Sequence, residues 1–309
     1  MHKIWEPDRW YSILRPYVDA CTRGSYQRLS VTGELPQEGA VIIAPNHCNT
    51  LMDALVVLQS RKEATVFGAR ADIFRKPAAN RALRFLRILP LARERDGAET
   101  IRENLSVFDE IEDTLANGIP FCLFAEGRHT PGREVQPLKK GVARIALRSA
   151  AQRPTVIVPA GLEYSHFFRY RESARLQYGQ PIDVNAFLSA RPGLTDQELT
   201  AALLEELRGR IQALISPEGP AYRRRWWVLP LWPAAALLAL PIWLPAELLC
   251  RKIKDKAFCN SVRYLFKLLL TPLMLLIWAL VFFLTLPWWA AAALCLLFLF
   301  SYGIFYDIV

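Results

Sequence analysis

The stretch GAVIIAPNHCNTLMDALVVLQSRK, residues 39–62, changes from one hydrophobic pattern to another around a histidine. Its first part is β-branched and apolar, which predicts a buried strand ending at Pro45. Its second part has the Thr-x-x-Asp form of a helix start at Thr50, followed by a helix-like run. His47 and Asp53 therefore lie on either side of a predicted passage from strand to helix.

The spacing of His47 and Asp53 decides whether the two side chains form a pair. Residues six apart on one continuous helix point to different faces, because helical neighbours are three or four positions apart. The side chains meet only if the intervening loop turns His47 back over the first helical turn. The alternative is that Asp53 caps the helix and that the histidine beside it is incidental.

The first 220 residues alternate between strand-like and helix-like segments. We expect strands at 28–33, 39–45, 64–69, 119–125, 154–163 and 174–179, and helices at 50–60, 77–87, 98–117, 136–151 and 195–214. This alternation predicts an α/β fold with a mixed, largely parallel sheet flanked by helices. In such sheets, functional sites collect at the carboxyl ends of strands. His47 and Glu126 each follow an expected strand, so both are candidates for one site.

The C-terminal third of the chain is far more apolar than the rest. The 39 residues 268–306 contain no charge, and 226–246 form a second uncharged run. A bilayer-spanning helix needs about 20 such residues, so the sequence predicts C-terminal transmembrane helices. We divide the chain into an N-terminal interfacial helix at 1–27, a soluble α/β domain at 28–220 and a membrane region at 221–309. A helix packed on the soluble domain is the alternative for the first segment.

The net charge of +9 is concentrated beside the apolar runs. Residues 223–267 include nine basic and two acidic side chains. Basic clusters next to membrane spans mark the cytoplasmic side and attract anionic lipid headgroups. We therefore expect a multi-pass membrane protein whose soluble domain faces the cytoplasm and contacts membrane lipids. Nucleic-acid binding is not expected, because the charge lies at the membrane boundary and no nucleic-acid-binding motif occurs.

The first apolar run, 226–246, contains four prolines and has basic clusters on both sides. A straight span would place one of those clusters on the outer face, against the positive-inside tendency. We expect a re-entrant or shallow helical hairpin instead, while a single straight span at 226–249 is the alternative. The run 268–306 is long enough for two crossings, with the turn near Pro287.

The sequence lacks the motifs that are typical of several classes of enzyme and binding site. The six cysteines and four histidines show no metal-ligand spacing, and we expect no metal site. The phosphate-binding loops GxxxxGK[ST] and GxGxxG and the nucleophile motif GxSxG are absent from the sequence. His47 is therefore better placed as a general base, with Asp53 on its other ring nitrogen to fix the tautomer and stabilise the imidazolium.

Three arginines, Arg70, Arg93 and Arg128, follow strand-like or apolar runs. Each one alone is compatible with a solvated surface charge. Arginine binds phosphate oxygens with a planar fork of donors. Arginines that follow successive strands on the expected edge of His47 therefore indicate a phosphorylated substrate.

These motifs occur together in one known family. The segments NHCNTLMD, FGARADIF, LPLAR, FAEGR and VIVPAGLEY stand in the order and approximate spacing of the glycerolipid acyltransferases. Residues 28–185 of this chain resemble that family, and within it the subset with five residues between the histidine and the aspartate. The resemblance implies an α/β acyltransferase domain at 28–220. It also implies transfer of an acyl group to glycerol-3-phosphate or 1-acylglycerol-3-phosphate in phospholipid biosynthesis.

The resemblance also implies the role of each site residue. His47 would be the catalytic base and Asp53 would orient it, while Arg93 would bind the phosphate of the acceptor. Glu126, Gly127 and Arg128 match the Glu-Gly block of the substrate site, and Arg70 stands where the family carries a basic residue. The donor would be acyl-CoA or acyl-carrier protein, with no cofactor.

The chain departs from the common pattern at three points. Most of the family has four residues between the histidine and the aspartate, the position of Ala125 is usually proline, and a serine is frequent near His129. The proposed base is unaffected, whereas the choice of acceptor is open, so an acyltransferase for a different lysolipid is an alternative. A non-catalytic lipid-binding membrane protein and a lipid hydrolase are the others, and the hydrolase lacks an evident nucleophile.

Overall fold

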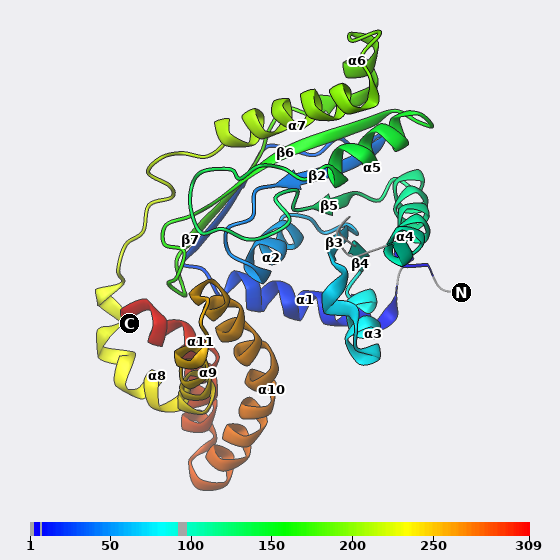
Figure 1. Cartoon of the computed structure of the whole chain (residues 1–309). Helices are drawn as coiled ribbons and strands as arrows, with labels where there is room; N and C mark the ends of the chain where they lie inside the picture. The colour runs from blue at the N-terminus through cyan, green and yellow to red at the C-terminus, as the bar shows by residue number, and fades with distance from the viewer. Residues whose placement is uncertain (1–2, 7, 92–97) are drawn as a thin grey trace.

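The computed structural model of the chain describes residues 3–6, 8–91 and 98–309, and an eight-stranded sheet forms the centre of this part (Figure 1). The strand order is β1-β7-β6-β2-β5-β3-β4, with β8 paired to β6. The strands are β1 Arg28–Thr32, β2 Ala40–Pro45, β3 Val66–Arg70, β4 Ile88–Leu91, β5 Phe121–Leu123, β6 Thr155–Tyr164, β7 Ser173–Tyr178 and β8 Ile182–Asp183.

The sheet is mixed and largely parallel, which confirms the fold class expected from the sequence. β6, β2, β5, β3 and β4 are neighbours that all pair in parallel. β7 runs antiparallel to β6 and parallel to β1, and β8 is also antiparallel to β6. The carboxyl ends of β2, β5, β3 and β4 therefore meet, in that order, at one edge of the sheet.

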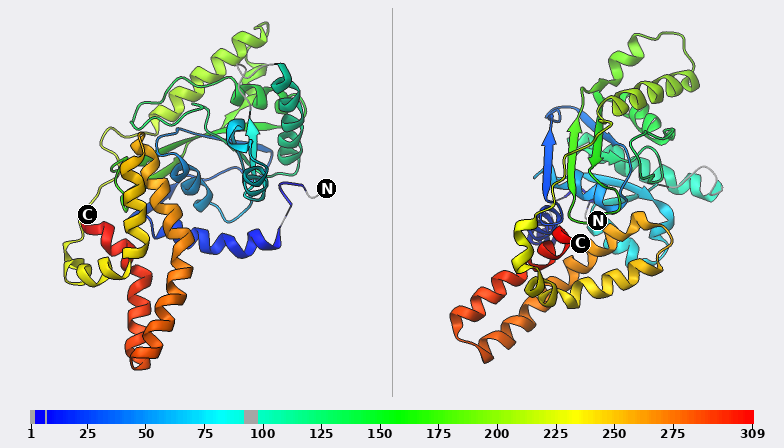
Figure 2. Two further views of the ribbon diagram at one scale, coloured as in Figure 1. Left: turned by 60° about the horizontal axis from the view of Figure 1, so that its bottom comes forward. Right: turned by 90° about the vertical axis from the view of Figure 1, so that its left-hand side faces the viewer.

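Helices cover both faces of the sheet (Figures 1 and 2). One face is covered by α1 and α2, and the other by α4, α5, α6 and α7. The helices of the described residues are α1 Arg9–Arg23, α2 Leu51–Gln59, α3 Pro77–Phe85, α4 Ala98–Ala116, α5 Gly141–Ala150, α6 Val184–Ser189, α7 Asp196–Ala213, α8 Trp232–Leu238, α9 Leu240–Lys252, α10 Cys259–Thr285 and α11 Trp288–Ile308.

The apolar run of β2 is explained by burial on both faces. Ile42 packs into the cluster beneath α4, α5 and α7, whereas Ile43 packs into the cluster that includes α2. Both isoleucines are fully buried. Because successive side chains of a strand point to opposite faces, a strand between two helix layers is apolar at every position. Each such side chain contributes about 1.5–3 kcal/mol on burial, which fixes the strand that leads into His47.

The expected strands and helices all occur, with small shifts at their ends. The sequence did not predict β4 or β8, which are only four and two residues long, and β4 contains Pro90 at the edge of the sheet. The helix expected at 136–151 begins at Gly141. The backbone before it is held outside a helix, because the N–H of Lys139 donates to the carbonyl of Ala125 across 2.7 Å.

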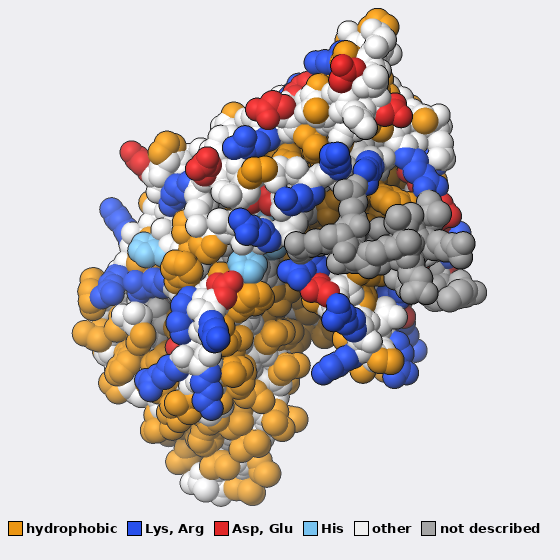
Figure 3. Space-filling model, in the orientation of Figure 1, with side chains coloured by type: hydrophobic (Ala, Val, Ile, Leu, Met, Phe, Trp, Pro, Cys, Tyr) orange, Lys and Arg blue, Asp and Glu red, His pale blue; other side chains and the backbone are white. Residues whose placement is uncertain are grey.

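α10 and α11 form a hairpin that projects from the domain (Figure 2). Lys256–Thr285 and Trp288–Ile308 are long and apolar enough to cross a membrane, judged by length and composition. The outward leucines are widely exposed, with 71% of Leu276 and 77% of Leu284 accessible. The space-filling view shows hydrophobic side chains covering this projection (Figure 3). A surface of this kind suits a lipid environment better than water.

The segment before α10 is sharply bent. Trp226–Leu238 and Leu240–Lys252 meet at 82°, so the described chain contains two candidate spans, or three if the bent pair counts as one. This bend contradicts the straight span at 226–249 that we considered as an alternative. Pro241 is one of the first two residues of α9, directly after the break at Ala239. It removes a helical hydrogen bond and favours such breaks.

α1 packs against the domain and the membrane region. The hydroxyl of Tyr17 donates to the carbonyl of Leu268 on α10 across 2.7 Å, and Thr22 contacts Tyr264. Trp10 and Ile13 on the same helix remain exposed. Side chains of α1, the sheet and the C-terminal helices share one hydrophobic cluster, so the core continues across the three segments that we expected as separate units. Contact of α1 with a membrane surface stays a prediction.

Candidate active site

The loop between β2 and α2 brings His47 and Asp53 together. The His47 Nδ1 and Asp53 Oδ2 atoms are 2.7 Å apart. Thr50 adopts a φ of 47°, an uncommon conformation for a residue that is not glycine, and the chain turns there before α2 begins. This turn folds His47 back over the first turn of the helix, which is the geometry that pairing requires at this spacing.

Asp53 is completely buried and its carboxylate is held by several donors. Oδ2 also accepts hydrogen bonds from the backbone N–H groups of Cys48 and Asn49, at 2.8 and 2.7 Å. Oδ1 accepts one from the Tyr164 hydroxyl at 2.7 Å. Asp53 thus holds the backbone ahead of the helix and contacts His47, whereas no side-chain cap forms at Thr50. A buried carboxylate with this many donors keeps one orientation.

The position of the His47 ring follows from these contacts. Because Nδ1 faces the Asp53 carboxylate, a proton on Nδ1 leaves the Nε2 lone pair free to accept another proton. The ring stacks on Phe124, with centroids 4.5 Å apart. About 18% of the side chain remains exposed, so the histidine is fixed but accessible. This is the arrangement that a general base requires.

The segment after β5 contacts the backbone of His47. Glu126 Oε1 accepts a hydrogen bond from the His47 N–H at 3.0 Å, and the Thr130 N–H donates to the His47 carbonyl at 2.9 Å. Gly127 turns the chain between them with a φ of +70°. Burial raises the pKa of Glu126 to about 7, although the hydrogen bond from His47 acts against that rise. The geometry therefore shows Glu126 as a support for His47, and its contact with substrate stays a prediction.

The structure describes two of the three arginines that the sequence indicated as phosphate ligands. Arg70 ends β3 and pairs with Asp72, and its side chain is about half exposed. Arg128 is exposed and has no ion pair with any residue that the structure describes. Arg128 follows β5, which is next to β2, and Arg70 ends β3, which is next to β5, so both lie at the same sheet edge as His47. Arg93 lies outside the described residues.

A second histidine near His47 was not predicted from the sequence. The His129 ring lies edge-on to the His47 ring, with centroids 5.9 Å apart. Its Nε2 is 2.8 Å from Oδ2 of Asp255, in the connection between α9 and α10. That hydrogen bond lowers the pKa of Asp255 below its ordinary value. Asp255 is 126 residues further along the chain, and no local pattern connects it with His129.

Residues at the start of α10 also contact the loop that carries His47 and Asp53. The Thr50 hydroxyl is 2.5 Å from that of Ser261 and 3.3 Å from the carbonyl of Ala257. Asn260 is within 3.5 Å of the Asn49 side chain. These buried contacts join the loop to the candidate membrane helix. The loop is therefore held by residues outside the α/β domain as well as by residues within it.

Comparisons with known proteins agree with this geometry. The sequence model of the family described as Acyltransferase matches residues 28–163. These residues carry the His47 and Asp53 loop, the Glu126 segment and β6. Residues 28–163 are therefore similar to the acyltransferase family.

Curated relatives are similar over parts of this segment. Glycerol-3-phosphate O-acyltransferase 2 of Saccharomyces cerevisiae is 32% identical over 130 residues, which cover 41% of this chain and 16% of the relative. Glycerol-3-phosphate O-acyltransferase 1 of the same yeast is 29% identical over 113 residues, 35% of this chain and 15% of the relative. An uncharacterized acyltransferase of Schizosaccharomyces pombe is 36% identical over 81 residues, 25% of this chain and 12% of the relative. The matches thus span less than a fifth of each relative.

Among solved structures, the 1-acyl-sn-glycerophosphate (LPA) acyltransferase PlsC of Thermotoga maritima superposes with a TM-score of 0.47 and 19% identity. The superposition covers 68% of this chain and 83% of that one.

Proposed function

We propose that the protein is a membrane-bound O-acyltransferase that moves a fatty acyl group from acyl-CoA or acyl-carrier protein to a hydroxyl of glycerol-3-phosphate or 1-acylglycerol-3-phosphate. The observation that carries this proposal is the 2.7 Å contact between His47 Nδ1 and the buried, multiply hydrogen-bonded Asp53 carboxylate. It supplies an oriented base at the carboxyl end of β2, in a segment that is similar to the acyltransferase family.

In the proposed reaction, His47 Nε2 takes the proton of the acceptor hydroxyl as the oxygen attacks the thioester carbonyl carbon. A carbon–oxygen bond forms, and collapse of the tetrahedral intermediate breaks the carbon–sulfur bond. The departing thiolate receives the proton from the imidazolium, which returns His47 to its neutral form. Asp53 stabilises the imidazolium between these steps. The thioester is already activated, so this chemistry needs no resident cofactor.

A phosphorylated acceptor is supported by the cations and by the relatives. Arg70 and Arg128 lie at the carboxyl ends of β3 and β5, at the sheet edge that also holds His47, and the planar donors of arginine suit phosphate oxygens. Arg93, by its resemblance to the family, would bind the same phosphate. Two of the yeast relatives are named glycerol-3-phosphate O-acyltransferases, which favours glycerol-3-phosphate among the candidates.

A multi-pass membrane location is supported by the apolar hairpin of α10 and α11. In Figure 3, Lys and Arg side chains gather where the hydrophobic projection joins the domain. Basic residues at such a boundary favour the cytoplasmic side. The α/β domain would then face the cytoplasm, where acyl-CoA and acyl-carrier protein are found. The bent pair before α10 would return to that side as a re-entrant hairpin.

An acyltransferase for a different lysolipid is the second candidate, because the interval between His47 and Asp53 has five residues where most of the family has four. The test is incubation of the purified full chain with radiolabelled acyl-CoA and a panel of acceptors: glycerol-3-phosphate, 1-acylglycerol-3-phosphate, lysophosphatidylcholine and glycerol. Label in a phosphorylated glycerol product supports the proposal. Label only in another lysolipid favours the second candidate, release of free fatty acid indicates a hydrolase, and no turnover indicates a lipid-binding protein.

A further inference from the structure

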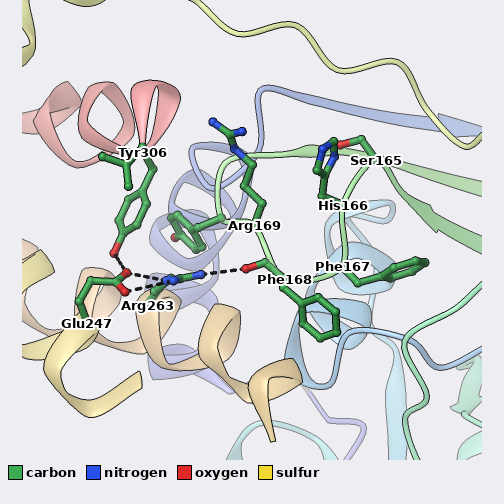
Figure 4. Close-up of a pocket in the computed structure, with 10 residues that line it drawn as sticks. Ser165, His166, Phe167, Phe168, Arg169, Glu247, Arg263 and Tyr306 are labelled. Carbon is green, nitrogen blue, oxygen red and sulfur yellow. Dashed lines mark hydrogen bonds and ion pairs between the residues drawn. The ribbon is translucent and has the colours of Figure 1, made fainter. Parts of the chain in front are cut away.

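A recess lies where the β6–β7 loop meets the C-terminal helices (Figure 4). It has a volume of about 550 Å³ and is lined by residues 165–170 of that loop together with Glu247, Arg263, Tyr306 and Val309. Within the described residues, none of these side chains is hydrogen-bonded to His47 or Asp53. The recess is therefore a separate feature of the surface.

On one wall of the recess, the charges of Arg263 and Glu247 are paired with each other. Arg263 donates to both oxygens of Glu247, at 2.7 and 3.1 Å, and to the carbonyl of Phe168 at 3.0 Å. The Tyr306 hydroxyl donates to Glu247 at 2.6 Å. Figure 4 shows this network with Arg263 between Glu247 and Phe168. It joins α9, the start of α10, the end of α11 and the β6–β7 loop.

Arg169 also lines the recess, and some of its hydrogen-bond donors have no acceptor among the described residues. Its Nε and Nη2 atoms are buried and have no hydrogen-bond partner among the described residues. The guanidinium lies over the Tyr222 ring, 4.6 Å from the centroid. The His166 ring is 5.3 Å from the same tyrosine. Buried donors in native structures are almost always paired, so this group of unpaired donors indicates a missing acceptor.

The nearby acidic residues do not supply that acceptor. Asp307 is engaged by Arg171 at 3.2 Å. Glu172 is buried and accepts the His166 N–H at 2.8 Å, and burial raises the pKa of its carboxyl well above the ordinary value. The recess thus contains one ion pair, Arg263 with Glu247, and one arginine whose Nε and Nη2 donors have no acceptor within the described residues.

We propose that this recess binds the phosphate-bearing headgroup of an anionic phospholipid, with Arg169 as the principal donor to the phosphate. The chemistry fits because guanidinium groups bind phosphate oxygens through paired donors. The position of the recess also suits a lipid headgroup. The recess lies at the end of α10 and α11 that is nearest the α/β domain, and this end is at the level of the headgroups if the two helices span the bilayer. This inference rests on the proposed membrane placement and does not require catalytic activity.

Two neighbouring features favour a lipid over free phosphate. Phe168 on the rim of the recess is 54% exposed, and Trp226 and Trp227 beside the basic run 223–225 are also widely exposed. Aromatic side chains of this kind lie at the headgroup level of membranes. Basic pockets at the ends of membrane helices bind anionic headgroups. A free phosphate would not require the aromatic rim.

The test measures binding of dioleoyl phosphatidylglycerol and dioleoyl phosphatidylcholine to the full chain in maltoside micelles by native mass spectrometry. Wild type should bind one phosphatidylglycerol in preference to phosphatidylcholine. Arg169→Gln should weaken the phosphatidylglycerol complex about tenfold or more, because it removes charge-assisted hydrogen bonds. Arg148→Gln is the matched control, since Arg148 is a partly exposed arginine on α5 paired with Asp109. Its affinity should equal that of wild type.

Several results would overturn the proposal. They are equal affinity of wild type for the two lipids, equal weakening by the two substitutions, and displacement of the lipid by millimolar inorganic phosphate. The wild-type preference is informative even if Arg169→Gln fails to fold. Arg169→Lys keeps the charge without the planar donors and should bind with intermediate affinity. Because the measurement needs no turnover, lipid binding and acyl transfer can fail independently.

Discussion

The Thr50 hydroxyl lies 2.5 Å from the Ser261 hydroxyl, and this contact joins the loop of His47 and Asp53 to the first turn of α10. The two residues are 211 positions apart. Thr50 also has the positive φ that turns the loop, so its conformation depends on what holds its side chain. The candidate membrane helix therefore helps to maintain the geometry of the candidate active site.

Ser261→Ala should loosen this loop. Removal of one buried hydrogen-bond partner destabilises a protein by about 1–3 kcal/mol, and we expect a lower thermal midpoint together with a severalfold lower turnover number. The control is Thr285→Ala, because the Thr285 hydroxyl on the same helix donates only to the Val281 carbonyl. Turnover of Ser261→Ala equal to that of the control would mean that α10 does not position the loop.

Glu126→Gln should change the dependence of stability on pH. The folded protein raises the pKa of Glu126 from 4.5 to about 7, so the fold favours the protonated carboxyl. The stability associated with that proton is complete below pH 4.5 and is lost as the pH rises through 7. Glutamine resembles the protonated form and can still accept the His47 N–H. The variant should therefore gain stability over wild type between these pH values, by up to roughly 3 kcal/mol above pH 7.

The measurement for Glu126 is the thermal midpoint at a series of pH values from 4.5 to 8. Glu134→Gln is the control, since Glu134 is exposed on the same segment. An advantage of Glu126→Gln that stays constant with pH, or that shrinks as the pH rises, would contradict burial as the cause of the raised pKa.

Arg128→Gln should weaken binding of the acceptor more than binding of the donor. A lost arginine–phosphate contact lowers affinity roughly 10- to 100-fold, so the KM for glycerol-3-phosphate should rise by about that factor while the KM for acyl-CoA changes little. Arg93→Gln should behave in the same way. Steady-state kinetics with each substrate varied in turn gives both constants. Equal KM values for glycerol-3-phosphate in wild type, Arg128→Gln and Arg148→Gln would make Arg128 a surface charge.

The arrangement of the C-terminal helices predicts which positions face outward. Single cysteines replace Arg224, Lys254, Trp288 and Ile308 in a cysteine-free chain, and intact cells are treated with a membrane-impermeant thiol reagent. Only position 288, at the turn between α10 and α11, should react from outside. Labelling at 254 from outside would mean that the bent pair crosses the membrane, and that the hairpin proposal is wrong.

Much of the fold was predictable because both faces of the sheet are buried. Runs such as the one ending at Pro45 are apolar at every position, and such runs between helical patterns predict parallel strands. β4 was missed because it is short and contains Pro90. Short edge strands bury too little surface to impose a strong pattern on the sequence.

The candidate site was predictable only in part. The sequence indicated His47 and Asp53 as possible partners, but their contact depends on Tyr164 on β6 and Ser261 on α10, which are distant along the chain. The pairing of His129 with Asp255 is of the same kind. Such contacts arise from tertiary packing, and no local spacing predicts them. Glu126 was expected at the site, whereas its hydrogen bond to the His47 backbone was visible only in the fold.

Acyl transfer by the His47→Ala variant tests the central claim most directly. Wild type, His47→Ala and Asp53→Asn are purified in parallel, and transfer from radiolabelled acyl-CoA to glycerol-3-phosphate is measured at saturating substrate. Loss of the general base should lower the turnover number of His47→Ala about 10²- to 10⁴-fold, while thermal midpoint and membrane association stay close to wild type. Asp53→Asn should be severely impaired as well. Near-normal turnover of a folded His47→Ala protein would contradict the proposed mechanism.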